Sequence, residues 1–224
     1  MLLIGSVGLR IGQTYLTTSL ELLATTAFIA VVSSAISLIL GYPVGNFLAT
    51  LGAKSRGLLG ALLVLPFLLP PFLIGITLLP LRGDDFDSNL GILLIICAHV
   101  VMNVGFVARI VASSQLPLEQ LEAARLDGAS NFLVRLRVSL PQQRAALAAA
   151  GLLIALYSAT SYGLVTSLGQ GVVATLETEI AISSLRDLCL SRSFVLALLQ
   201  TLLTLTLFVF AQRACAKPTP VFGE

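Results

Sequence analysis

The chain has 224 residues, of which 57% are hydrophobic and only 11% are charged, with a formal net charge of +2. Soluble domains carry about 25% charged residues, so this composition excludes an ordinary soluble protein. It predicts a membrane protein surrounded by lipid, and we expect no nucleic-acid partner.

Five stretches of 20 or more residues contain no Asp, Glu, Lys or Arg. A helix of roughly 20 apolar residues spans the hydrocarbon core, because it pairs its own N–H and C=O groups. The pattern therefore predicts an all-α protein with about five transmembrane helices, at 22–53, 57–81, 88–108, 145–176 and 193–212.

The segment 1–20 precedes these spans and is interrupted by Arg10, Gln13 and several Thr and Ser residues. It lacks the basic start and the cleavage site of a signal peptide. We expect an interfacial segment there, and leave open whether it belongs to a sixth crossing. One membrane domain over 21–213 and a cytoplasmic tail over 214–224 complete the predicted organisation.

Prolines interrupt the first two spans. Pro43 lies near the end of the first, and the second carries Pro66, Pro70 and Pro71. Because proline removes a backbone donor, it kinks or ends a helix, so the second span should not be straight. The break either shapes the helix bundle or forms a movable wall of a translocation path, for which Pro66 and Pro70 are candidates.

Polar side chains mark the third and fourth spans. His99 and Asn103 are four residues apart and share a helix face; they either line a path or form hydrogen bonds between helices. Tyr157, Ser161 and Tyr162 belong to a polar group in the fourth span, which suits either a hydrophilic pore or close helix packing.

The loop over 169–192, expected on the outer side, and the cysteines indicate less about function. Glycines at the start of 169–192 predict a flexible exit from the fourth span. Glu177 and Glu179 could contact a docking partner or a cationic solute, or only solvate the loop. The three cysteines, at 97, 189 and 215, have no metal-ligand spacing, so we expect no metal site.

The basic residues are unevenly distributed between the two sides of the predicted bundle. Cytoplasmic loops carry an excess of Lys and Arg, which predicts an outside N-terminus and a cytoplasmic C-terminus. One side holds nine of the 13 basic residues, namely Lys54, Arg56, Arg109, Arg125, Arg135, Arg137, Arg144, Arg213 and Lys217.

The segment between spans three and four predicts a helix–turn–helix. Pro117 suits the start of a short helix. The negative charges of Glu119 and Glu122 would interact favourably with the positive end of the helix dipole. Gly128 supplies the left-handed residue that ends such a helix. A second short helix over 131–138 should lead to the next span.

This segment also carries a motif. Glu122-Ala123-Ala124, Gly128, then nine residues and Val138-Ser139-Leu140-Pro141 resemble the cytoplasmic EAA loop of type I ABC importer permeases, with Val138 in place of isoleucine. The resemblance implies that the first short helix docks on an ATPase. The coupling residues that it implies are Glu119, Glu122, Ala123, Ala124, Asp127, Gly128, Leu140 and Pro141.

The resemblance implies a permease subunit of the bacterial inner membrane that is not itself an enzyme. ATP and Mg would bind the ATPase subunits, and this chain would bind no cofactor. The other implied partners are a second permease subunit, identical or different, and an external or periplasmic solute-binding protein. An ion-coupled secondary transporter would need intramembrane carboxylates, and the five stretches contain none.

Secondary matches concern the solute. Several short runs resemble the thiamine and iron(III) branch of these importers. They are Leu90-Gly91-Ile92, Ala98-His99-Val100 with Asn103, Ser167-Leu168-Gly169, the run 174–182 and Leu199-Gln200-Thr201. Thiamine or iron(III) is therefore the predicted solute, with polyamine and sulfate or molybdate as alternatives.

Overall fold

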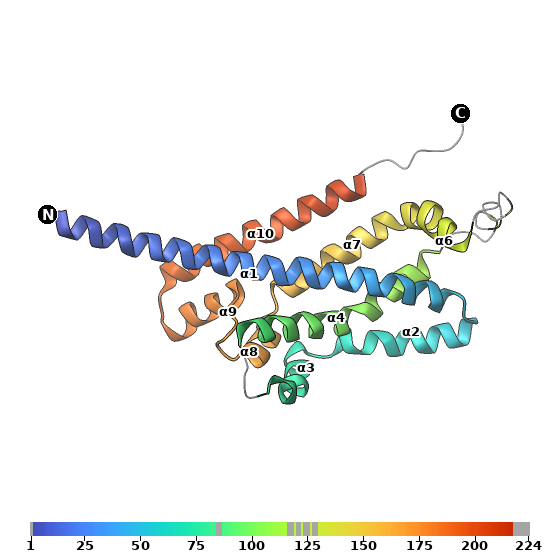
Figure 1. The fold of residues 1–224 in the computed structure, drawn as a ribbon, viewed down its shortest axis with the longest axis horizontal. Helices are drawn as coiled ribbons and strands as arrows, with labels where there is room; N and C mark the ends of the chain where they lie inside the picture. The colour runs from blue at the N-terminus through green and yellow to red at the C-terminus, as the bar shows by residue number, and fades with distance from the viewer. Residues whose placement is uncertain are drawn as a thin grey trace. The chain divides into compact units, whose positions relative to one another are not determined.

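The computed structural model describes the backbone of residues 2–83, 87–115, 119, 122, 126 and 130–216, and the side chains of these residues from 17 to 213 except 131. In this part of the chain the regular structure is entirely helical (Figure 1). The long helices are α1 (Leu2–Ala49), α2 (Ala53–Leu68), α4 (Ser88–Ser113), α7 (Leu140–Ala159) and α10 (Leu190–Ala216). The shorter ones are α3 (Pro71–Leu78), the 3-10 turn η1 (Leu79–Arg82), α6 (Asn131–Val134), the π-helices η2 (Arg135–Ser139) and η3 (Ile182–Arg186), α8 (Tyr162–Gly169) and α9 (Leu176–Ala181).

The predicted spans correspond to these helices. Three helices are long and apolar enough to cross a membrane by themselves, over Thr17–Ala49, Ser88–Ser113 and Leu190–Arg213. Two broken pairs, Ala53–Leu68 with Pro71–Arg82 and Phe132–Ala159 with Tyr162–Gly169, raise the number to five if each pair is one span. The all-α membrane fold is therefore confirmed, with all five regions near their predicted places.

Helix α1 differs from its prediction at both ends. The backbone of 2–20 belongs to the same helix as the first span, instead of forming a separate segment before it. Pro43 lies inside the helix, which continues to Ala49. One proline removes a single donor, and the helix continues past it.

The second span breaks where its prolines predicted. Leu69 and Pro70 are extended, with ψ angles of 143° and 128°, and Pro71 begins α3. The residue before a proline is disfavoured in the helical region, so two consecutive prolines end α2 at Leu68. Pro66, by contrast, lies within α2.

The fourth span also breaks, at Thr160 and Ser161, where no proline stands. Ser161 leaves the helical region with a ψ of 77°. The Nε2 atom of Gln200 in α10 donates to the carbonyl oxygen of Ala159 at 3.0 Å. A carbonyl freed at membrane depth needs such a donor, so the Gln200 side chain stabilises the break.

The chain divides into two compact units. The first comprises Met1–Val32, Pro70–Ala98 and Leu156–Thr206, and the second comprises Ser33–Leu69, His99–Ala155 and Leu207–Glu224. In the first, a buried cluster joins α1, α9 and α10 through Leu22, Leu176 and Leu196. In the second, α4 and α7 pack through Val107, Val111 and Ile154, with Leu38 and Tyr42 of α1 against them.

Candidate functional site: the EAA-like loop and its anchors

The EAA-like loop, residues 116–130, joins α4 to α6. Glu119 and Glu122 are helical and exposed, and Leu126, between the motif positions, is 89% exposed. Ala123, Ala124, Asp127 and Gly128 lie outside the described residues.

The second half of the predicted helix–turn–helix is not a separate helix. Segments α6, η2 and α7 follow one another without interruption, so 131–138 forms the first turns of the fourth span. Pro141 has no N–H for the carbonyl of Arg137, and the π-helix ends two residues before it, with the Leu140 N–H donating to the Arg135 carbonyl. A wider turn at this point accommodates the proline without ending the helix. Leu140 is half-buried and Pro141 is exposed.

The Arg135 carbonyl also links the helix that begins with α6 to α1. The hydroxyl of Tyr42 donates to the Arg135 oxygen at 3.4 Å. Tyr42 also packs against the buried cluster of Val107, Val111 and Ile154. The π-turn is thus held by one side chain that reaches it from another helix of the same unit.

Two amide side chains hold the ends of the loop together. Gln143 of α7 donates from Nε2 to the carbonyl of Ser114, at the end of α4, at 2.9 Å. Gln115 donates to the Val111 carbonyl at 2.8 Å and to Oδ1 of Asn46 in α1 at 3.4 Å. The segments that enter and leave the EAA-like loop are therefore tied to each other and to α1.

The helices of the second unit, which hold the EAA-like loop, pack closely against one another. A Cβ atom at Gly105 of α4 would overlap the carbonyl oxygen of Leu63 in α2. One at Gly45 of α1 would lie 2.6 Å from the carbonyl oxygen of Ala108 in α4. The rings of Phe67 and Phe106 stack with centroids 4.8 Å apart. Motion of the loop should therefore carry α1, α2 and α4 with it.

Sequence reasoning missed these anchors. Tyr42, Asn46, Gln115 and Gln143 lie outside the motif, and none forms a recognisable pattern. A usable signal was nonetheless present, because Gln143 follows Pro141 closely and Asn46 stands in a long charge-free stretch. Polar side chains at such places need hydrogen-bond partners.

The candidate path residues fall into both units. In the second, His99 and Asn103 are fully buried, and Nδ2 of Asn103 donates to the His99 carbonyl at 2.7 Å. Pro66 is half-buried there. In the first, Ser161 is buried, Tyr157 is half-buried, and Pro70 and Tyr162 are exposed. The role of these residues in a path stays a prediction.

The loop over 169–192, for which a flexible start and an outward position are predicted, is more ordered than expected. It contains the short helix α9, which Thr175 caps in a capping box with Thr178. The N–H of Leu176 donates to Oγ1 of Thr26 in α1 at 2.9 Å. Gln170 and Gly171, with φ angles of 39° and 84°, form the turn after α8. The glycine there serves a defined turn, and the capping residues were the signal for the helix.

Several acidic residues on the side predicted to face outward make local contacts. Glu179 forms an ion pair with Arg192 at 2.6 Å. Oδ1 of Asp87 accepts from the N–H of Leu90 at 2.8 Å, near the start of α4. Burial raises the pKa of the Glu177 carboxyl, so it takes up a proton at a higher pH than an exposed glutamate does. Asp84 and Asp85 lie outside the described residues.

Comparisons with known proteins place this helical fold among membrane transport proteins. Residues 37–217 match the family described as "Binding-protein-dependent transport system inner membrane component". Two inward-facing structures of the MetNI methionine ABC transporter superpose with TM-scores of 0.65 and 0.71 at 18% identity, covering 87% and 88% of this chain and 95% and 94% of theirs. A bacterial ABC transporter involved in the import of the acidic polysaccharide alginate gives 0.65 at 14% identity, covering 90% and 82%. At these identities the likeness shows the fold alone. No curated protein matches the sequence.

Proposed function

We propose that this chain, which belongs to the family of binding-protein-dependent transport system inner membrane components, imports a cationic solute, thiamine or iron(III), across a bacterial inner membrane. The chain is a multi-pass permease subunit of an ABC importer and is not itself catalytic. Such permeases work with ATPase subunits, a second permease subunit and a solute-binding protein.

The anchored EAA-like loop carries the proposed mechanism. An ATPase that grips the exposed face of Glu119, Glu122 and Leu126 would move the loop as the nucleotide sites close. The hydrogen bonds of Gln143 and Tyr42 would pass that motion to α4, α7 and α1. Import is driven if the closed ATPase and the docked, loaded receptor favour the outward-open state over the inward-open one.

The polar residues of the spans are the proposed path. We assign it to His99, Asn103, Tyr157, Ser161 and Tyr162, with the proline breaks at Pro66 and Pro70 as movable parts of its wall. His99 and Asn103 are fully buried here, so a rotation of α4 would have to expose them during transport.

The solute proposal rests mainly on the resemblance of 90–103 and 167–182 to the thiamine and iron(III) branch. Acidic residues on the side predicted to face outward would favour a cationic solute over an oxyanion. Glu179 forms an ion pair with Arg192, and Asp87 accepts a hydrogen bond from the Leu90 N–H, so these residues add little support. The fold does not determine the solute, because proteins of similar fold belong to a methionine transporter and to a transporter involved in alginate import.

Uptake by the complete importer tests the proposal. Proteoliposomes holding the permease, its ATPase and its binding protein should accumulate radiolabelled thiamine or iron(III) saturably, and only with internal ATP. Polyamine and molybdate serve as competing substrates in the same vesicles. Accumulation of molybdate with neither thiamine nor iron would refute the assignment of the solute, while leaving the permease role intact.

A further inference from the structure

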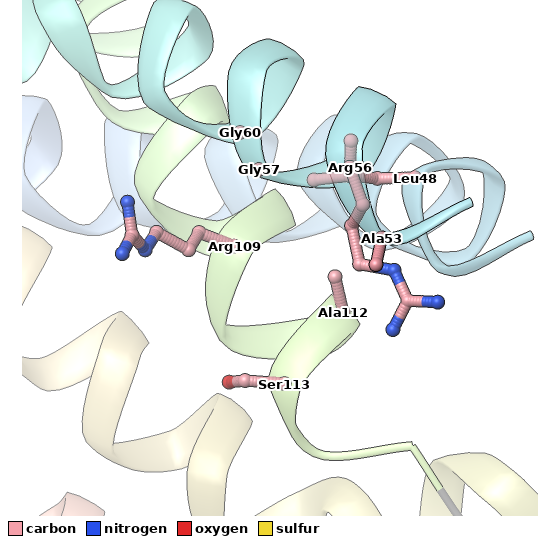
Figure 2. A pocket seen from close by; sticks show the side chains of 8 residues that line it. All are labelled: Leu48, Ala53, Arg56, Gly57, Gly60, Arg109, Ala112 and Ser113. Carbon is pink, nitrogen blue, oxygen red and sulfur yellow. The ribbon is translucent and has the colours of Figure 1, made fainter. Parts of the chain in front are cut away.

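A basic cavity lies in the second unit. It has a volume of about 410 Å³ and is formed by the end of α1, the start of α2 and the end of α4 (Figure 2). Two arginines and a group of small or apolar residues line it. These are Leu48, Ala53, Arg56, Gly57, Gly60, Arg109, Ala112 and Ser113.

The cavity has an excess of positive charge. Figure 2 shows the guanidinium groups of Arg56 and Arg109 on different sides of the pocket, with Ala112 between them. Among the described residues the ion pair found joins Arg192 to Glu179, so neither cavity arginine has a carboxylate partner in that part of the chain. Arg56 is held in place by donating from Nη2 to the Leu51 carbonyl at 3.0 Å.

The start of α2 adds to this charge. Ala53, the first residue of α2, lines the cavity, and its N-cap, Gly52, provides no side-chain acceptor. The first N–H groups of a helix attract anions. The cavity therefore combines two arginines with a helix N-terminus, and its lining contains no acidic residue.

We propose that this cavity binds the phosphate headgroup of an anionic phospholipid of the cytoplasmic leaflet. The inference rests on the proposed orientation, which puts Arg56 and Arg109 at the cytoplasmic interface. Basic pockets between transmembrane helices on that side bind such headgroups.

The surroundings favour a lipid over a free anion. Next to the cavity, α2 exposes Leu58, Leu62 and Leu65, with 64%, 50% and 50% of each residue accessible. Acyl chains can cover that face while the phosphate reaches the arginines. A bound lipid would also brace the last turns of α4, from which the EAA-like loop departs.

Native mass spectrometry of the assembled importer tests the proposal. The complex is released from nanodiscs of phosphatidylglycerol or of phosphatidylcholine, and retained lipids are counted per permease. We expect retention of phosphatidylglycerol over phosphatidylcholine. Each lost arginine should weaken phosphatidylglycerol binding about fivefold, because a basic residue near an anionic membrane contributes roughly 1 kcal/mol. The test variants are Arg56→Gln, Arg109→Gln and the double variant.

Two further variants separate binding from folding. Gly57 has no atom within 4 Å of an added Cβ, so Gly57→Leu should fill the cavity and displace the lipid while keeping both arginines. Arg213→Gln removes a basic residue of α10 outside the lining and should leave retention unchanged. Arg109→Gln leaves the hydrogen bond from Arg56 to the Leu51 carbonyl intact. A loss of lipid in this variant therefore cannot come from loss of that hydrogen bond.

Three results would overturn the proposal. The first is unchanged phosphatidylglycerol retention in both the double variant and Gly57→Leu. The second is displacement of the retained lipid by millimolar inorganic phosphate alone, which would make the ligand a soluble anion. The third is loss of the ATPase subunit from Arg109→Gln in lipid-free detergent, which would assign the arginines to a protein contact.

Discussion

Gly105 shows how a single residue sets the distance between two helices. Any side chain there would overlap the carbonyl oxygen of Leu63, so α2 and α4 can approach closely only with glycine. We expect Gly105→Val to separate them and to destabilise the fold by about 1–3 kcal/mol, the usual cost of overpacking. Thermal unfolding of the purified permease measures it. Gly57→Ala, which meets open space, should be neutral or slightly stabilising, because alanine favours helix over glycine. Equal stability of the two variants would contradict the prediction.

Gln143 is the residue that closes the base of the EAA-like loop. In Gln143→Leu the Ser114 carbonyl loses its side-chain donor, which should lower stability by about 1 kcal/mol and weaken the link from the loop to α4. We expect normal insertion but less transport for each ATP hydrolysed, measured as the ratio of uptake to ATPase rate. The neighbouring Gln142 is exposed, so Gln142→Leu is a matched control. An unchanged ratio in Gln143→Leu would show that the contact plays no part in coupling.

The first short helix of the EAA-like loop is the element predicted to grip the ATPase. Its end at Gly128 lies outside the described residues, so the left-handed turn stays a prediction from sequence. Gly128→Val should block that turn at a local cost of about 1–2 kcal/mol. The permease should still insert and yet lose its ATPase during co-purification. Gln142→Val, which places the same residue at an exposed position outside the loop, should retain it. Full co-purification and transport in Gly128→Val would show that no such turn is needed.

Elements differ in how far the sequence predicts them. The spans follow from long charge-free stretches, and Pro70 and Pro71 locate the break in the second span. The break at Ser161 was not predicted, because its stabilising donor, Gln200, is 39 residues away in sequence and becomes a neighbour only after folding. Helix α6 was predicted as a helix but not as part of the fourth span, since a π-turn that absorbs Pro141 leaves no mark in the sequence.

At the scale of the whole molecule, the candidate site was predicted only where a motif marks it. The EAA-like loop could be identified because its residues have fixed types at fixed spacing. Its anchors, Tyr42, Gln115 and Gln143, act through backbone carbonyls, which any residue can supply. The cavity of Arg56 and Arg109 joins residues from separate helices, and no local pattern brings them together.

The orientation of the whole chain gives the last prediction. The predicted spans put nine of the 13 basic residues on the side that carries the EAA-like loop, so this side should be cytoplasmic. Ser88 begins α4 and Ser130 precedes α6, and both are exposed. After the native cysteines have been replaced by serine, Ser88→Cys should react with a membrane-impermeant maleimide added outside intact cells. Ser130→Cys should react only after the membrane has been permeabilised.

Labelling after permeabilisation is the control for accessibility, because it must reach both positions. Cys97 and Cys189 are exposed, and retaining either would add a background signal, which is why their replacement comes first. An odd number of crossings separates Ser88 from Ser130 if α4 spans the membrane once. Reaction of both positions from outside intact cells would therefore contradict the single crossing of α4, and reaction of Ser130→Cys alone would invert the orientation and place the EAA-like loop beyond reach of a cytoplasmic ATPase.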